Sequence, residues 1–459
     1  MSDLSAGPPG PLALPEYTPM GSAVRTDQER WPTLSANGFD RLESWRTHRN
    51  APVWVHATGD LLVAADHRTL REAKAALRQT EPPANPPAWV TALIDRCTQH
   101  TRHYRPWRGS AFSDLPTIGR ADLVTRLADF VPDDVDLSRV VQGTSSGSTG
   151  STLILPLHPV EISRDIVLFE HLLDGLGVAW PCDLDRFALL SVVDQLQAFT
   201  YASPMTYRNE QMMARVNLDQ RAWRRPGDRE DFLNEANPQV ITGTALSLLR
   251  LAELETSIRP LALISGAVHL TPAARTAVST RFEVPLLDLY GLKETGPVAV
   301  SVDGGPHVVV PRRVHVEVVD DDGFPLPDGS RGELTVTVDG NPYLPLLRYR
   351  TGDTGILEHR DGRQYIHGLD GRLPVSFRAA DGRVVPSVDL TQHLQHFGAL
   401  AWSVHQRRDG LVEAHIHGGD LTGIARALRS HLGDIVTATA VNGLTELGPG
   451  KPRRYSTDL

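Results

Sequence analysis

Between residues 187 and 288, short apolar runs alternate with segments of helical spacing, and this alternation constrains the fold more than any other feature. The runs occupy residues 187–191, 240–241, 261–264 and 284–288. The segments between them, such as 245–254 and 271–280, repeat apolar residues at helical intervals. Short apolar runs separated by helices are typical of strands that are buried on both faces. We therefore expect an α/β fold in layers.

The pattern changes on either side of this region. Residues 306–366 contain period-two apolar runs broken by Asp-Gly turns, which predicts a β-rich subdomain. The last 90 or so residues predict a compact α+β module, with helices at 387–397 and 421–432 and strands at 400–405, 411–415 and 435–441. The start is rich in Pro, Gly and Ser and predicts a loose arm. We expect an arm at 1–40, a large domain at 41–370 and a small domain at 371–459.

Composition excludes several classes of protein. A chain of 459 residues with 41% apolar content is long enough for a large core and more than one domain. A net charge of −9 argues against a nucleic-acid partner. No apolar run reaches the roughly 20 residues of a membrane span, and the start lacks a basic leader pattern. Two cysteines cannot make a four-thiolate metal site. We expect a soluble cytoplasmic protein with no membrane partner.

Residues 140–152 form a hydroxyl-rich glycine loop between two apolar runs. Glycines let the backbone approach an anion, and Ser and Thr hydroxyls add hydrogen-bond donors. No Gly-Lys-Ser/Thr follows, so the loop is not a Walker loop. A flexible linker would have a similar composition. The loop's candidate phosphate ligands are Thr144, Ser145, Gly147, Ser148, Thr149 and Gly150.

Three further motifs follow in a fixed order. They are Asp-Leu-Tyr-Gly-Leu-Lys-Glu-Thr-Gly at 288–296, Arg-Tyr-Arg-Thr-Gly-Asp at 348–353 and Gly-Pro-Gly-Lys-Pro-Arg-Arg at 448–454. With the loop and the segments at 97–105 and 115–123, they resemble the ANL superfamily of adenylate-forming enzymes, in particular phenylacetate CoA ligases and their capsule-biosynthesis relatives. The resemblance runs from about residue 90 to the end. It implies a large N-terminal domain and a small mobile C-terminal domain joined near residue 370.

The resemblance implies roles for individual residues. The loop would bind the ATP phosphates, Tyr290 would pack on adenine, and Glu294 would be the Mg²⁺ carboxylate. Asp353 would take both ribose hydroxyls, which suits the two oxygens of a carboxylate. Lys451 would bridge the substrate carboxylate and the α-phosphate, although a plain basic tail explains it too. Lys293 stands where relatives have Ser or Thr, and it either reaches the same phosphate oxygen or points outward.

Other positions match less specific parts of the family pattern. Ser265, Gly266 and Ala267 resemble a segment along adenine and the acyl pocket, and a tight turn explains them equally well. The remaining cofactor-binding candidates are Asp288, Gly291 and Arg372, and the substrate-binding candidates are Phe199, Tyr201, Thr242, Gly243, Thr244 and Gly291. Core packing is an equally simple explanation of the aromatic stretch around Tyr201. At the implied hinge, Pro374-Val375 replaces the usual acidic pair, which leaves the acceptor open.

These features predict an enzyme that uses ATP and Mg²⁺ to activate a carboxylic acid, aromatic or small and cyclic, as an acyl adenylate. Coenzyme A is the family's usual acceptor, and an amine or a carrier-protein thiol are the alternatives. A degenerate, non-catalytic adenylate-binding protein is a rival of another class, and a polysaccharide-linked structural role has only the capsule resemblance behind it. A homodimer is compatible with the resemblance, and the sequence leaves the oligomeric state open.

Overall fold

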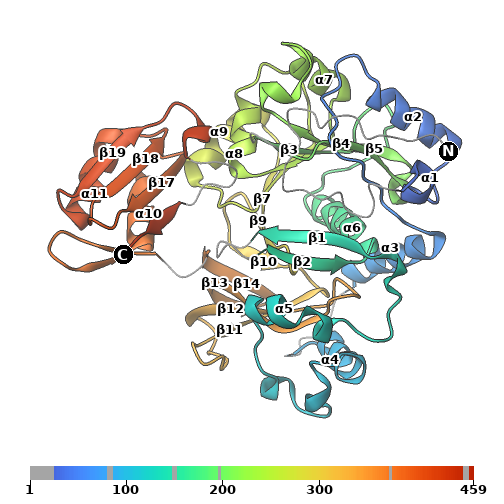
Figure 1. Cartoon of the computed structure of the whole chain (residues 1–459), viewed down its shortest axis with the longest axis horizontal. Helices are drawn as coiled ribbons and strands as arrows, with labels where there is room; N and C mark the ends of the chain where they lie inside the picture. Colours follow the sequence, from blue (N-terminus) through green and yellow to red (C-terminus); the bar gives the residue numbers. More distant parts are fainter. Residues whose placement is uncertain (1–24, 80–85, 147–151, 195–197, 372–374, 448–453) are drawn as a thin grey trace, which may run out of the picture.

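The computed structural model describes residues 25–79, 86–146, 152–194, 198–371, 375–447 and 454–459. Figure 1 shows a large part that carries most of the strands and a small module at one side, built from the end of the chain. In the described residues, no helix is long and apolar enough to cross a membrane.

The large part is organised around one mixed sheet. Its strands, in spatial order, are β11 (Val314–Val319), β12 (Arg331–Val338), β13 (Leu346–Arg360), β14 (Arg363–Asp370), β10 (His307–Val309), β9 (Gly296–Val302), β8 (Leu286–Leu292), β7 (Ala262–Gly266), β6 (Val240–Gly243), β3 (Leu189–Val193), β5 (Gln211–Asn217) and β4 (Tyr201–Met205). Strands β8, β7, β6, β3 and β5 run parallel. The sequence predicts the β-rich region as a subdomain, whereas its strands continue the parallel sheet through β10 and β9.

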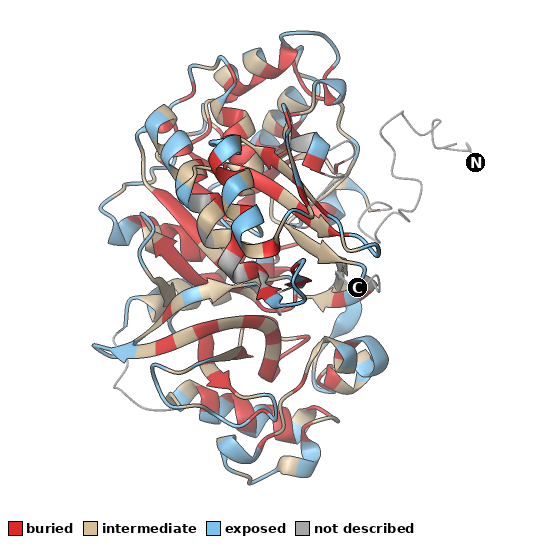
Figure 2. Cartoon of the chain, turned by 90° about the vertical axis from the view of Figure 1, so that its left-hand side faces the viewer, coloured by how far each residue is buried: buried red, intermediate tan, exposed pale blue. Residues whose placement is uncertain are grey.

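Helices cover both faces of the parallel strands, which confirms the expected α/β layering. Residues Ile166, Phe169 and Leu173 of α6 (Val160–Gly175) pack with side chains on one face. The other face is covered by α7 (Asp228–Ala236), α8 (Ala245–Ala252) and α9 (Pro272–Phe282). Figure 2 shows buried residues along the strands and exposed ones on the outward sides of the helices.

The N-terminal half of the large part adds helices and a hairpin. The helices are α1 (Asp27–Arg30), α2 (Ala36–Arg46), α3 (Ala64–Leu77), α4 (Ala88–His100) and α5 (Arg120–Arg126). Strands β1 (Val141–Ser146) and β2 (Thr152–Leu157) pair antiparallel and flank the hydroxyl-rich loop. The loose arm expected at 1–40 is wrong for residues 25–40, which form α1 and the start of α2. Here Trp31 is buried and its Nε1 donates to the carbonyl oxygen of Pro204 at 3.1 Å, so tertiary packing overrides the composition.

The small module pairs four strands into a second sheet, in the order β19 (Val436–Ala440), β18 (Val412–His417), β17 (Ala401–Gln406) and β20 (Tyr455–Thr457). A short hairpin, β15 (Ser376–Arg378) with β16 (Val384–Pro386), precedes the helices α10 (Ser387–His396) and α11 (Leu421–Leu432). Apolar residues of both helices and of the inner sheet face form a separate core. The placement of a mobile-domain boundary at residue 370 stays a prediction.

The small module contacts the large part next to the carboxyl ends of β6 and β7. Leu246, in the first turn of α8, packs with Ala401, Val441 and Leu447 of the module. The Thr271 hydroxyl, which caps α9, donates to the carbonyl oxygen of Leu400 at 3.4 Å. These contacts hold the module beside the strand ends where most of the candidate site residues lie.

Candidate active site

The motif at 288–296 forms the carboxyl end of β8 and the turn into β9. Leu292 pairs with Gly296, so Lys293 and Glu294 lie at the tip of this hairpin. Gly291 is required for packing inside the hairpin, because a Cβ there would lie 2.4 Å from the carbonyl oxygen of Gly296. The turn therefore presents a cation and a carboxylate side by side.

Tyr290 and Asp353 are joined by a hydrogen bond, although 63 positions separate them in the sequence. The Tyr290 hydroxyl donates to Oδ2 of Asp353 at 2.9 Å, and both side chains are buried. Burial, reinforced by the Asp353 carboxylate, raises the pKa of the Tyr290 phenol well above its usual value. The phenol therefore stays a donor and holds the carboxylate in one orientation.

Glu294 forms a buried ion pair with Arg120, the first residue of α5. The sequence motifs assign no role to Arg120, although the segment 115–123 that contains it is part of the family resemblance. A carboxylate oxygen is the ligand type that Mg²⁺ prefers, and the ion often takes only one or two protein carboxylates. A metal ion at Glu294 would have to share or displace the guanidinium.

Lys293 turns away from Glu294, toward β1. Its Cε lies 3.5 Å from the position that a Cβ on Gly143 would occupy. Burial raises the pKa of Asp165 on α6 to about 6, and the charges of Arg313 and Lys293 oppose that rise. The Lys293 side chain is exposed and lies beside the strand that carries Thr144 and Ser145. Of the two alternatives, this position fits a lysine directed toward the phosphate hairpin.

The candidates at the ends of β6 and β7 differ in accessibility. Ser265 is completely buried, whereas Gly266 is half-buried and Ala267 is exposed. Ala267 has a φ of +64°, a strained conformation for a residue with a side chain. Thr242 and Gly243 are half-buried at the end of β6. The Thr244 hydroxyl accepts a hydrogen bond from the Ser247 amide at 3.1 Å, so it caps α8.

Asp288 lies in β8, in the middle of the sheet. It pairs with Ser265 of β7 on one side and with Ser301 of β9 on the other. Burial raises the pKa of its carboxyl to about 6, against the opposing charge of Arg275. Nε2 of His307 is 3.9 Å from Oδ2 of Asp288, and burial lowers the pKa of His307 to about 4. No sequence motif indicates Arg275 or His307, because they approach Asp288 from other elements, Arg275 from α9 and His307 from β10.

We expect Asp288→Asn to stabilise the protein at neutral and alkaline pH but not under acidic conditions. In the folded protein, the Asp288 carboxyl keeps its proton up to about pH 6, whereas in the unfolded chain it releases the proton near pH 3.8. The free energy of unfolding of the wild-type protein therefore falls as the pH rises through 6. A shift of about two units corresponds to roughly 3 kcal/mol. Denaturant unfolding of both proteins between pH 4 and 8 measures the difference. A difference that does not change with pH would contradict the assignment.

The substrate-binding candidates Phe199 and Tyr201 lie near His56. The ring centroids of His56 and Phe199 are 5.3 Å apart, and those of His56 and Tyr201 are 6.1 Å apart. All three side chains are half-buried, so each presents surface to solvent. The cluster joins the edge strand β4 to the segment that precedes α3.

Several candidates lie outside the described residues: Gly147, Ser148, Thr149, Gly150, Arg372 and Lys451, with the hinge residue Pro374. The residues on either side of the Lys451 segment are described. Leu447 packs against Leu246 of the large part. Burial lowers the pKa of His269, which follows β7, to about 3, and the charge of Arg454 adds to this shift. Both ends of the segment 448–453 therefore lie beside the carboxyl ends of β6 and β7.

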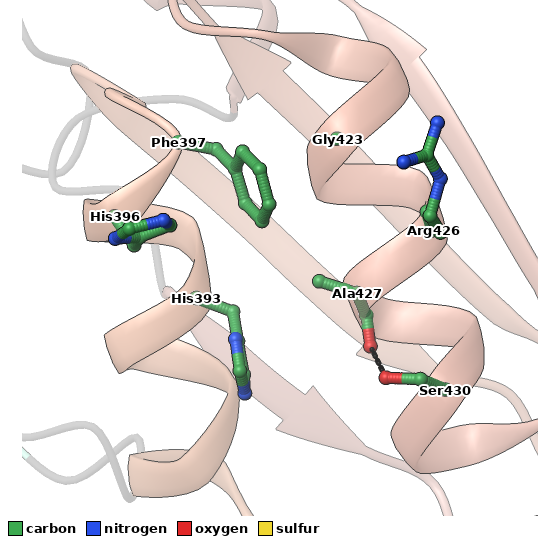
Figure 3. Close-up of a pocket in the computed structure, with 7 residues that line it drawn as sticks. All are labelled: His393, His396, Phe397, Gly423, Arg426, Ala427 and Ser430. Carbon is green, nitrogen blue, oxygen red and sulfur yellow. Dashed lines mark hydrogen bonds between the residues drawn. The ribbon is translucent and has the colours of Figure 1, made fainter.

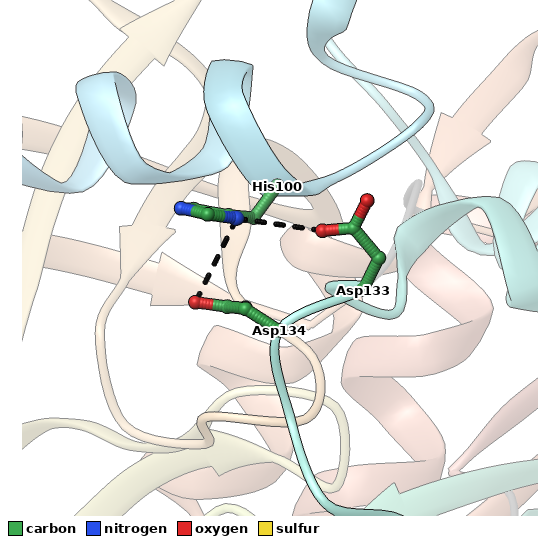
Figure 4. Close-up of side chains that lie close together, drawn as sticks. All are labelled: His100, Asp133 and Asp134. Carbon is green, nitrogen blue, oxygen red and sulfur yellow. Dashed lines mark ion pairs between the residues drawn. The ribbon is translucent and has the colours of Figure 1, made fainter.

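Two other features lie apart from these residues. A groove of about 560 Å³ between α10 and α11 is lined by His393, His396, Phe397, Gly423, Arg426, Ala427 and Ser430 (Figure 3). At the end of α4, His100 pairs with Asp133 at 3.4 Å and with Asp134 at 3.8 Å (Figure 4). Arg105 also pairs with Asp133, so these groups form a local ion-pair network. His100 and Arg105 belong to the segment 97–105 of the family resemblance, but none of the candidate site residues belongs to either feature.

The layered mixed sheet and the small α+β module beside its strand ends are shared with solved acid–CoA ligases, so the chain has the fold of these enzymes. The structure of a 2-hydroxyisobutyryl-CoA ligase in the postadenylation state, in complex with 2-HIB-AMP, matches with a TM-score of 0.60 and 15% identity, over 82% of this chain and 91% of that one. A second structure of that ligase, with R3-HIB-AMP, matches with a TM-score of 0.59 and 15% identity, over 83% and 94% of the two chains.

In sequence, the chain is a distant and partial homologue of phenylacetate-coenzyme A ligases. It is 38% identical to the enzyme of Aromatoleum evansii over 96 residues, 20% of this chain and 22% of that protein. It is 35% identical to the enzyme of Escherichia coli (strain K12) over 96 residues, with the same coverage, and 32% identical to that of Thermus thermophilus over 140 residues, 28% of this chain and 32% of that protein. The matched segments thus span less than a third of these relatives. No family model matches the chain.

Proposed function

We propose that this protein is an ATP-dependent ligase that activates a carboxylic acid as an acyl adenylate. In the proposed reaction, a carboxylate oxygen of the acid attacks the α-phosphorus of ATP and pyrophosphate leaves. An acceptor then displaces AMP from the adenylate. The acid is aromatic or small and cyclic, and coenzyme A is the acceptor. In-line attack on the α-phosphorus depends mainly on the positions of the reactants and on the stabilisation of charge. The reaction therefore requires no nucleophilic side chain.

The observation that carries this proposal is the hydrogen bond between Tyr290 and Asp353. It joins two motifs from distant parts of the sequence at the end of β8, next to the Lys293–Glu294 hairpin. A ring for a nucleobase, a carboxylate for a vicinal diol and charged groups for phosphates are together what a nucleotide requires. The contact of the small module with α8 supports the role of Lys451, because it holds Leu447, which precedes the segment 448–453, beside the carboxyl end of β6.

The residues fit a bound magnesium ion. Glu294 supplies an oxygen ligand and is buried beside the Arg120 guanidinium, which can move aside or share the carboxylate. When bound, Mg²⁺ would neutralise phosphate charge. Lys293 would bring a full positive charge to the oxygen that a hydroxyl contacts in relatives, and Asp353 would fix the ribose. The backbone of β1 would position the loop donors.

Pyrophosphate exchange into ATP, measured with a panel of aromatic and cyclic acids, tests this function. Exchange that depends on both an acid and Mg²⁺ is the expected result. ATP binding without exchange for any acid of the panel would favour the non-catalytic adenylate-binding protein instead. Glu294→Gln is the matched variant, since it keeps the size of the side chain but removes the charge that binds the metal.

Single-turnover kinetics separate the possible acceptors. The preformed adenylate is mixed with coenzyme A or with a set of amines, and loss of adenylate is followed in parallel with product. We expect thioester formation with coenzyme A. Faster amide formation would assign an amine as the acceptor and would fit a hinge that Pro374 restricts.

A further inference from the structure

Arg215 lies in a row of side chains near the carboxyl ends of the strands. In β5 it pairs with Tyr201 of β4 on one side and with Ser191 of β3 on the other. Ser191 pairs in turn with Thr242 of β6. Residues paired in this way point to the same face of a sheet, here the face that α6 covers. Two of the proposed substrate-binding residues, Tyr201 and Thr242, therefore stand at the two ends of a row that contains Arg215.

The Arg215 side chain makes no hydrogen bond or ion pair with the residues that the structure describes. Its Nε is inaccessible to solvent and has no acceptor. Three arginines that are more deeply buried each pair with a carboxylate: Arg208 with Glu170, Arg313 with Glu161 and Arg348 with Glu317. Arg215 is half-buried, so part of its side chain is accessible to a ligand. An acidic ligand would give it the carboxylate partner that these arginines have.

The surroundings of Arg215 are aromatic and positively charged. His56, Phe199 and Tyr201 are half-buried, so the group borders solvent. Burial lowers the pKa of His56, and the charges of Arg30 and Arg215 lower it further. The charge of Arg215 also opposes the rise that burial causes in the pKa of Tyr201. Arg30 adds a second positive charge near His56. Together these groups suit a ring that carries a negative group.

We propose that Arg215 binds a second carboxylate of the substrate acid, at the end remote from the carboxyl group that is adenylated. The proposal rests on the proposed ligase function and names the substrate class as dicarboxylic acids with a ring between the two carboxyl groups. A guanidinium matches a carboxylate with two parallel hydrogen bonds. Thr242 is two strands away, roughly 10 Å at the usual strand spacing, a span that matches the length of a ring with a carboxyl group at each end.

The test compares matched acids with one and two carboxyl groups. The probes are phenylacetate with 4-carboxyphenylacetate, and benzoate with terephthalate. In pyrophosphate exchange, we expect the wild-type protein to have a kcat/KM at least about tenfold higher for the diacid of a pair. Arg215→Met should lower the diacid value by about 10- to 100-fold, mainly through KM, the range for hydrogen bonds to a charged group. The kcat/KM for the monoacid and the affinity for ATP should change by less than about threefold, because the substitution removes no hydrogen bond to either of them.

Two variants serve as controls. Arg408→Met removes an exposed arginine of the small module and should leave both acids unaffected. Arg215→Lys keeps the charge without the planar fork and should retain part of the diacid preference. If one of the two Arg215 variants fails to bind ATP, that variant is misfolded, and the other variant then tests the proposal.

Calorimetric binding of the same acids distinguishes the failure of this inference from the failure of the ligase function. If the diacids bind no better than the monoacids, and Arg215→Met changes neither, the Arg215 site is refuted while exchange with monoacids would still support the ligase. If no acid supports exchange but diacids bind in a manner that requires Arg215, the ligase function fails and the carboxylate site stands.

Discussion

Replacement of Lys451 by alanine is expected to reduce acyl-adenylate formation about 10²-fold or more, with ATP binding nearly unchanged. A compact cation between the attacking carboxylate and the α-phosphate stabilises charge that develops only in the transition state. Both flanks of the segment 448–453 lie beside the large part, through Leu447 and Arg454. Pyrophosphate exchange and an equilibrium measurement of ATP binding check the two halves of this expectation.

Arg453→Ala is the matched control, because it removes a positive charge two residues away. If the segment acts only as a basic tail, the two substitutions will have similar effects. Leu246→Asp tests the docking of the small module, since it places a charge in the apolar contact that holds Leu447. We expect this variant to lose exchange activity while it keeps its affinity for ATP. Unchanged pyrophosphate exchange in Lys451→Ala would rule out the assignment.

Replacement of Asp353 by alanine should weaken ATP binding by on the order of 1.5–3 kcal/mol, the usual range for hydrogen bonds to a charged group. The carboxylate is oriented by the Tyr290 hydroxyl, and its backbone amide donates to the Thr351 hydroxyl at 3.0 Å. If the carboxylate oxygens of Asp353 accept hydrogen bonds from the two ribose hydroxyls, the wild-type protein will bind ATP more tightly than 2′-deoxy-ATP, and the variant will not. Dissociation constants for both nucleotides provide the measurement.

The Tyr290→Phe variant separates orientation from contact, because it removes the hydroxyl donor but keeps the ring and the carboxylate. We expect a smaller loss of ATP affinity than in Asp353→Ala. Thermal unfolding of each variant shows whether the fold is retained, as Asp353 is buried. A dissociation constant for ATP that changes less than about threefold in Asp353→Ala would remove the ribose role, since a hydrogen bond to a charged group contributes more than that.

Local elements could be predicted from the sequence with small errors. The helix expected at 387–397 is α10 (Ser387–His396), and the one expected at 421–432 is α11 (Leu421–Leu432). The apolar run at 240–241 lies in β6, and the run at 261–264 overlaps β7 except for its first residue. These predictions succeed because apolar periodicity and turn residues act over a few positions. The same local information placed Glu294 after the end of the strand expected at 284–288, and the structure places it at the tip of the β8–β9 hairpin.

Only the tertiary structure decided which of these elements meet. The sequence separated the β-rich region from the layered one, but β10 pairs with both β9 and β14 and joins them in one sheet. Trp31 is buried against β4, although its surroundings in the sequence indicated a loose arm.

The partners of the candidate site residues follow the same rule. Arg120 reaches Glu294 across 174 positions. Arg215 acquires its neighbours through the register of β3, β4 and β5. Strand order and ion pairs depend on which edges and faces come together in space, and this information is spread over the whole chain. The sequence by itself therefore determined the chemical groups and their local turns, while the fold determined which groups face each other.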